Sequence, residues 1–412
     1  MTTNPKFNTK GSILAAYTTA SLWFGTHVGG GFASGNQVVQ YFAQYGSGGW
    51  LIPVIAMGLL AVVMYIYMEF AHLNGFDNFK DTFEHLYPVP KMEILWEIFN
   101  IVVVLAACAS AVAGAGNVLA NFMGINYEGK NVILMNLVIV AILIVLTIFG
   151  IKLVMAASSI LGIIIIIVTL VMIVTGFSAD LDAITKSIVE ANPGFQVNPD
   201  PYTHSMSSAI IRGIFVYAGF QCISLGPMIA GQPELTEGGI KKAAVIGWIM
   251  NGSALALSAA MLAKWYPLLK AMVDAQIPVN GVTNLLNVPN QTVLQLANVK
   301  AVMLAYSILL FAAFVSTCIT LTYSMIQRFS PVFFPNSIKK ETVRNLCVGV
   351  IVIAVCFLVS LLGLTNIIKY AYGYSGYYAI FALILPAFIW GIPKIRKLKA
   401  GPNATTGVDP NA

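Results

Sequence analysis

Residues 25–36 read GTHVGGGFASGN, with five glycines inside an apolar stretch that runs from about residue 12 to residue 45. Glycine weakens a helix, and here it stands beside Thr, His, Ser and Asn, so we do not expect a straight helix. Backbone that leaves helical hydrogen bonding at membrane depth is tolerated only where it is buried in protein or lines a cavity. The stretch therefore predicts an interrupted helix at a binding site, with close packing of small residues between helices as the alternative.

This stretch belongs to the first of ten apolar segments that are long enough to cross a hydrocarbon core of about 30 Å. They span approximately residues 12–45, 50–71, 94–123, 131–149, 153–177, 205–230, 243–263, 297–327, 345–363 and 366–391. Hydrophobic residues make up 58% of the chain and charged residues 9%, so most of the surface must face lipid. Because the segments are continuously apolar and do not alternate, we predict an all-α membrane protein with ten transmembrane helices.

The net charge of +6 follows from the predicted topology. Lys and Arg gather in loops on one side, for example at Lys241, Lys242 and 394–399, and the positive-inside rule places that side in the cytoplasm. We predict a bacterial-type cytoplasmic membrane protein with both termini inside. Residues 1–400 form one transmembrane domain, and the polar residues 401–412 form a disordered cytoplasmic tail.

The sixth segment contains a weaker counterpart of the first. Residues 217–222 read YAGFQC in mid-segment, and Gly226-Pro227 follows. The ten segments divide into two halves of five, residues 11–177 and 204–392, and segments one and six are the first segment of each half. Because five is an odd number, the second half crosses the membrane in the opposite orientation to the first. A 5+5 inverted repeat with helices one and six broken in the membrane favours a secondary transporter, whose site lies at the breaks.

Three local patterns carry a resemblance to a known group of proteins: residues 25–31, Glu69-Phe70-Ala71, and residues 313–317, which read AFVST. Together they resemble the amino acid, polyamine and organocation transporter superfamily, which has the LeuT-type fold. Residues 29–37 more narrowly resemble a bacterial group of amino-acid permeases whose substrates are poorly established. The resemblance implies a symporter that takes up a small neutral amino acid or a related zwitterion together with sodium.

A sodium site is expected where the first and eighth segments meet. Ala313, Ser316 and Thr317 lie on one face of a helix and offer hydroxyl and carbonyl oxygens. The resemblance implies that they bind sodium together with the carbonyl groups of Gly25 and Val28. The alternative is that the two hydroxyl groups bond to their own helix backbone. Sodium is the expected coupling ion, and no other cofactor is indicated.

A zwitterionic substrate fits two broken helices, because freed amide groups attract a carboxylate and freed carbonyl groups attract an ammonium. Neither break contains Asp or Glu, which disfavours strongly cationic substrates. The candidate substrate-binding residues are Thr26, His27, Gly29, Gly30, Gly31, Ser110, Tyr217, Gly219, Phe220 and Gln221.

Four ionisable residues are candidates for gating or coupling. His27 is a candidate proton carrier, or alternatively a neutral side chain bonded to freed backbone. Glu69 is expected to brace helix six, as the resemblance implies, or to be a solvated interfacial carboxylate. Arg212 is expected in an outer vestibule. Lys152 is expected in a cytoplasmic turn, although the resemblance implies that a lysine placed deeper in this helix would replace sodium.

The cysteines and the two longest loops lead to two further expectations. All five cysteines lie in or beside apolar segments without CxxC spacing, and we expect free thiols. The two longest loops, about 178–204 and 264–296, are expected outside, and the second is either a lid or a simple connector.

Other function classes are less consistent with the sequence. It holds no HExxH motif, no paired catalytic carboxylates and no His/Cys cluster, so an enzyme is not expected. No nucleic-acid motif or obligatory protein partner is indicated, which leaves the bilayer and a small molecule as partners. A proton-coupled symporter or exchanger of another organic solute is the alternative, and an ion channel is less favoured.

Overall fold

The computed structural model describes residues 13–27, 29–149, 164, 167–333 and 341–400. Val28, Lys152 and the predicted tail 401–412 lie outside the described residues. Every regular element in the described ranges is helical: α1 (Ile13–His27), α2 (Gly30–Ala33), α3 (Asn36–Tyr41), η1 (Ala43–Trp50), α4 (Leu51–Asn74), α5 (Phe79–Leu86), α6 (Ile94–Met123), α7 (Lys130–Phe149), α9 (Leu181–Ala191), α10 (Met206–Ser208), η2 (Ala209–Val216), α11 (Tyr217–Gln221), η3 (Cys222–Ser224), α12 (Leu225–Gly231), η4 (Gln232–Glu234), α13 (Glu237–Asp274), α14 (Pro289–Leu296), α15 (Lys300–Phe333), α16 (Glu341–Ser360), α17 (Leu364–Asn366), η5 (Ile367–Tyr372), α18 (Gly373–Ala379), η6 (Ile380–Ile384), η7 (Ala387–Gly391) and α19 (Ile392–Ala400).

Long apolar helices dominate the described part of the chain. Seven of them are long and apolar enough to cross a membrane, and the number rises to eight if Ile167–Ser178 and Leu181–Ala191, bent by 70°, count as one span. The predicted multi-pass helical architecture is therefore confirmed. The predicted number of ten helices is not tested, because the segment expected at 153–177 is described only in part.

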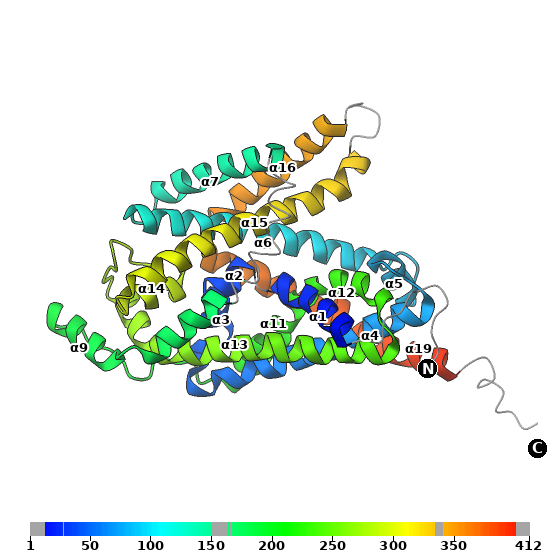
Figure 1. The fold of residues 1–412 in the computed structure, drawn as a ribbon, viewed down its shortest axis with the longest axis horizontal. Helices are drawn as coiled ribbons and strands as arrows, with labels where there is room; N and C mark the ends of the chain where they lie inside the picture. Colours follow the sequence, from blue (N-terminus) through cyan, green and yellow to red (C-terminus); the bar gives the residue numbers. More distant parts are fainter. Residues whose placement is uncertain (1–12, 28, 150–163, 165–166, 334–340, 401–412) are drawn as a thin grey trace, which may run out of the picture.

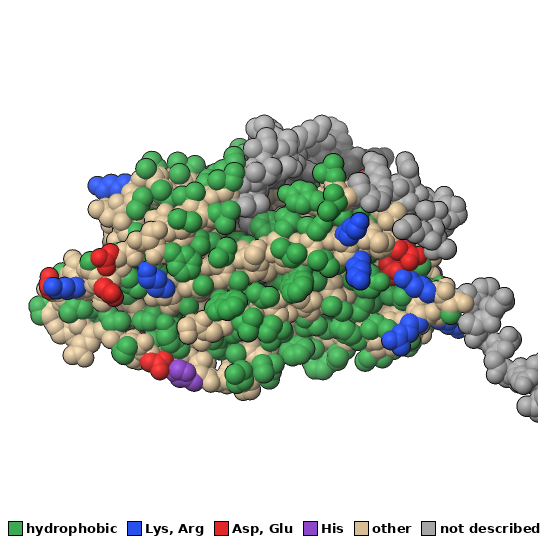
Figure 2. Space-filling model, turned by 60° about the horizontal axis from the view of Figure 1, so that its bottom comes forward, with side chains coloured by type: hydrophobic (Ala, Val, Ile, Leu, Met, Phe, Trp, Pro, Cys, Tyr) green, Lys and Arg blue, Asp and Glu red, His purple; other side chains and the backbone are tan. Residues whose placement is uncertain are grey.

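The long helices run side by side in two groups that enclose the shorter elements (Figure 1). On one side α6 packs against α7, α15 and α16, and on the other α13 packs against α4 and α1. The elements of segments one and six lie between these groups, and the start of α1 and the end of α19 lie at the same end of the molecule (Figure 1). Figure 2 shows charged side chains toward the two ends, with a broad hydrophobic surface between them.

The sixth segment is wound irregularly but is not interrupted. A π-helix (η2) leads into α11, a 3-10 turn (η3) follows, and α12 continues. Met206–Glu234 therefore forms one span, and the predicted break in helix six is wrong as a gap in the helix. Within this span the helix changes to a 3-10 turn at Cys222–Ser224, just before Gly226 and Pro227.

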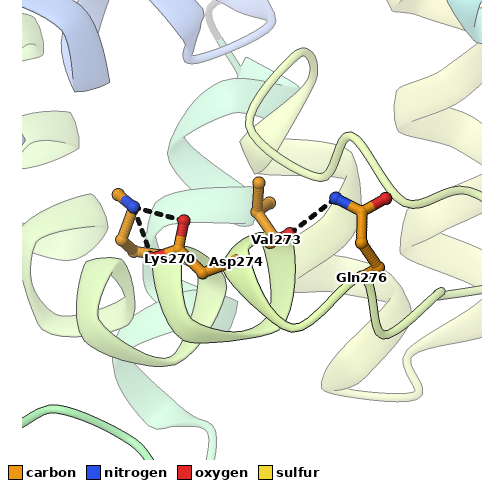
Figure 3. Close-up of polar contacts among 4 residues, drawn as sticks. All are labelled: Lys270, Val273, Asp274 and Gln276. Carbon is orange, nitrogen blue, oxygen red and sulfur yellow. Dashed lines mark hydrogen bonds and ion pairs between the residues drawn. The ribbon is translucent and has the colours of Figure 1, made fainter.

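The helix after the sixth segment is longer than predicted. The segment expected at 243–263 forms α13, which continues through Pro267 to Asp274, so part of the predicted loop 264–296 is helical. At its end Lys270 pairs with Asp274, and the Gln276 side chain donates to the Val273 carbonyl at 3.0 Å (Figure 3). This ion pair is exposed, so it adds little to the stability of α13.

Two long helices are also joined covalently. Cys108 of α6 and Cys318 of α15 form a disulfide, and their Cα atoms lie 4.6 Å apart. The prediction of free thiols is wrong for this pair, while Cys222, Cys347 and Cys356 are free. The pairing has no sequence signal, because 210 residues separate the partners and neither belongs to a CxxC pattern.

Candidate functional site

The first apolar segment is divided at the glycine cluster. Helix α1 ends at His27 and α2 begins at Gly30, and the amide group of Gly29 donates to the carbonyl of His27 at 2.8 Å. A second interruption follows at Gly35, whose φ of 84° is the left-handed conformation that glycine adopts without strain. The segment thus leaves helical geometry at the place where the sequence predicts it.

The imidazole of His27 connects three elements at this break. Its Nδ1 lies 2.5 Å from Asn251 Oδ1 of α13, and its Nε2 lies 2.9 Å from the Tyr217 hydroxyl of α11. The Asn251 amide nitrogen donates to the Gly247 carbonyl, so its oxygen faces the ring. Nδ1 therefore carries the proton and Nε2 accepts from Tyr217. Asn251 is not predicted from the sequence, because a single Asn in an apolar span carries no pattern.

A second polar contact joins segments one and six. The Thr26 hydroxyl lies 2.8 Å from the Ser224 hydroxyl in the 3-10 turn η3. It also reaches the Trp23 carbonyl of its own helix at 2.8 Å. Thr26 therefore sits beside the predicted partner segment, but it meets Ser224, which the sequence did not single out.

Aromatic rings fill the space next to His27. The ring centroids of Phe42 and Tyr217 are 4.5 Å apart, those of Tyr217 and Phe220 are 4.8 Å apart, and Phe220 and Tyr372 are 5.0 Å apart. Tyr41 closes the cluster 5.3 Å from Phe220. We call Tyr41, Phe42, Tyr217, Phe220 and Tyr372 the ring cluster. Its members are buried and bring the predicted residues Tyr217 and Phe220 to the break.

Two predicted residues lie at the margin of the ring cluster. The Ser110 hydroxyl donates to the Ala107 carbonyl at 2.8 Å and is 3.5 Å from the Tyr372 hydroxyl. The guanidinium of Arg212 lies 5.8 Å from the centroid of the Tyr41 ring. Arg212 thus contacts the ring cluster through Tyr41.

Gly219 has a packing role. A Cβ atom at this position would lie 2.4 Å from the carbonyl oxygen of Gly376, and one at Gly376 would lie 2.3 Å from the carbonyl oxygen of Val216. These two glycines let α11 and α18 approach closely. Gln221, the next predicted residue of α11, is buried.

The predicted sodium-site residues lie partly together. A Cβ atom on Gly29 would be 4.0 Å from the Thr317 methyl carbon, so the break in segment one faces α15. On α15 the Ser316 hydroxyl donates to the Ala313 carbonyl at 3.5 Å. Gly31 instead faces the Gln37 side chain, and Gly25 has open space around it.

Glu69 does not brace the sixth segment. Its carboxylate pairs with Lys399 of α19, and the side chain is only 1% exposed. The bracing comes instead from His72, whose Nδ1 lies 3.0 Å from the side-chain oxygen of Gln232 in η4. The Gln232 nitrogen donates to the Phe76 carbonyl at 2.7 Å. The prediction failed because Lys399 lies far along the chain and competes for the carboxylate.

The loop before α15 packs against the part of segment one that follows the break. The Asn290 side chain donates to the Ala33 carbonyl at 3.0 Å, and its backbone amide donates to the Ser34 carbonyl at 3.2 Å. The Asn36 side chain donates to the Leu286 carbonyl at 2.8 Å. Residues 287–294 are buried, so this part of the loop is packed into the protein, and whether it acts as a lid stays a prediction.

Comparisons with known proteins bear on the family and the fold of the chain. The family described as Amino acid permease matches residues 14–267, more than half of the chain, while no curated protein matches. A mutant of the Eremococcus coleocola manganese transporter is similar in structure at a TM-score of 0.52 and 14% identity, over 96% of this chain and 88% of that chain.

A second similar structure is that of MhsT in complex with L-phenylalanine, at a TM-score of 0.50 and 15% identity, over 95% of this chain and 96% of that chain. At such identities the likeness shows the fold alone, which is that of LeuT-fold transporters. The family match goes further than the fold. The chain therefore belongs to the amino acid permease family, so it is a membrane transporter and not an enzyme.

Proposed function

We propose that this chain is a secondary active transporter that takes up a small neutral amino acid, or a related zwitterion, together with sodium. The break in segment one, held by His27 against segment six and α13, is the observation that carries the proposal. It fits a ten-helix 5+5 inverted repeat that works by alternating access around segments one and six. Both termini are proposed to lie in the cytoplasm.

The polar groups at the break favour a neutral substrate. Thr26, His27, Tyr217, Ser224 and Asn251 meet there, and all offer uncharged donors or acceptors. A carboxylate would take the freed amide groups of the glycine cluster, and an ammonium would take the freed carbonyl groups. The ring cluster beside them would contact an apolar side chain. A zwitterion with a small apolar side chain is the solute that uses all three features.

Sodium is proposed to bind where segment one faces α15. The Thr317 side chain lies next to Gly29, and Ser316 and Ala313 follow on the same helix face. Sodium, a hard cation, prefers oxygen ligands, which hydroxyl and carbonyl groups provide. Sodium would thus bind between segment one and α15, and the substrate would bind on the His27 side of the break.

Proton coupling is the second candidate, and His27 favours it. This ring bridges Asn251 and Tyr217 at the point where segments one and six meet. Protonation at Nε2 would turn an acceptor for Tyr217 into a donor and so change the bond between the two segments. In this alternative His27 carries the coupling proton, and the hydroxyl groups of α15 bind no ion.

A thermal-shift screen of the purified protein separates these candidates. Amino acids and other small solutes are tested in sodium and in potassium, each at two pH values. A ligand present at 100 times its Kd stabilises the folded state by about 2.7 kcal/mol. Stabilisation by a neutral amino acid only in sodium supports the proposal. Equal stabilisation in potassium with a dependence on pH favours the proton version, and a response only to other solutes rejects the substrate class.

A further inference from the structure

A buried carboxylate near the α19 end of the molecule is held by a lysine from the other end of the sequence. Glu69 of α4 is 1% exposed, and its Oε1 pairs with Lys399 Nζ. In the described part of the chain its Oε2 has no hydrogen-bond partner. A buried carboxylate with one cationic partner depends strongly on that partner, because removal leaves an uncompensated charge.

The same lysine also reaches a third helix. Lys399 Nζ lies 3.3 Å from Glu237 Oε2 in the first turn of α13. One residue of α19 therefore joins α4 and α13 at the end of the molecule where α1 begins (Figure 1). Nearby, the Thr19 hydroxyl of α1 lies 3.3 Å from the Gly231 carbonyl at the end of α12. Segments one, two, six, seven and ten are thus fastened together at this end.

We propose that Lys399 is a latch that keeps the transporter closed at the α19 end, and that its ion pairs with Glu69 and Glu237 break each time this end opens. The inference rests on the alternating access of the proposed function. Helix α19 would then have a role beyond ending the last span, because it carries the cation on which a buried acid of α4 depends. Separation of α19 from α4 admits water to Glu69, which replaces the lost partner.

The test uses cysteine modification in the full-length protein without substrate. Native Cys222 is free and buried in the η3 turn, from which the second half of segment six leads to the α19 end. A second reporter is Thr19→Cys, at the contact of α1 with α12. Lys399→Met should raise the rate of N-ethylmaleimide modification at both reporters about tenfold, the factor that about 1.4 kcal/mol gives. Mass spectrometry assigns the modified residue.

Three controls make the result specific. Lys397→Met removes a charge from an exposed position of α19 and should leave both rates unchanged. Cys356, buried in α16, should stay as slow as in the parent protein, whereas unfolding would expose it. In a Glu69→Gln background Lys399→Met should add little, because the buried charge is already gone.

Each contrary result is decisive. Unchanged modification of both reporters in Lys399→Met, an equal effect of Lys397→Met, or a full effect in the Glu69→Gln background overturns the latch. The reporters need no substrate. If the reporters respond while no amino acid is transported, the latch stands and the proposed function fails. If uptake is normal and neither reporter responds, the proposed function stands and the latch fails.

Discussion

Replacing Asn251 by leucine tests whether the His27 ring holds segment one to α13. Leucine is close to asparagine in size but removes the oxygen that accepts the hydrogen bond from Nδ1 at 2.5 Å. His27 is 3% exposed, so water does not replace this oxygen. A buried donor left without an acceptor costs about 1 to 3 kcal/mol. We expect Asn251→Leu to lower the free energy of unfolding by that amount.

The assay is unfolding in mixed detergent micelles, arranged as a double-mutant cycle. His27→Leu alone leaves the Asn251 oxygen buried without its donor and should also destabilise the protein. The double variant replaces both partners of the His27–Asn251 bond by apolar groups, which removes the atoms that each single variant leaves unsatisfied in this bond. The double variant should lose less unfolding free energy than the sum of the losses in the two single variants, by about 0.5 to 3 kcal/mol.

An additive cycle would refute this reasoning, because two residues that do not bond have no coupling energy. Asn366→Leu is the matched control. Asn366 is exposed on the last segment, and its side chain donates to the Leu362 carbonyl of the same segment at 2.9 Å. A surface change of this kind should stay within about 0.5 kcal/mol of the parent protein.

Three further substitutions test the break and its neighbours. Thr317→Ala should weaken the dependence of uptake on sodium more than its dependence on pH, and an unchanged sodium titration would remove Thr317 from the ion site. Gly30→Leu should abolish uptake into proteoliposomes while membrane insertion, measured by surface labelling, remains normal. Gly114→Ala places a Cβ atom 2.1 Å from the Phe314 ring; it should cost about 1 to 3 kcal/mol of unfolding free energy, and Phe314→Leu should restore part of it.

The sequence predicted the features that arise from local composition. Helix α6 has the bounds 94–123 that its continuous apolar run indicates. The division of segment one follows from the glycines at 29–31, because few residues in that stretch favour a helix. Such features depend on neighbours along the chain, which a single sequence contains in full.

Segment six shows where local composition is ambiguous. Gly219 was read as a sign of a break, but its missing side chain admits Gly376 of α18. A glycine can serve an interruption or a close approach, and only the position of the neighbouring helix distinguishes them. The helix continues through the π-helical turn η2 and the 3-10 turn η3.

Partners distant in the sequence could not be predicted. Asn251 is 224 residues from His27, and Ser224 is 198 residues from Thr26. Each is an ordinary polar residue in an apolar helix, so nothing in the sequence names its partner. The sequence can thus single out a glycine cluster as a candidate site, but it cannot name the partners that tertiary packing brings to it.

Bonds on both sides of the break constrain how a transport cycle starts. Asn290 of the 287–294 loop holds the Ala33 carbonyl on one side, and Lys399 holds Glu69 on the other. Under the proposed alternating access, one set of these bonds breaks to admit an amino acid while the other set holds. Weakening both sets together should therefore produce a leak, whereas weakening either alone should only shift which side is open.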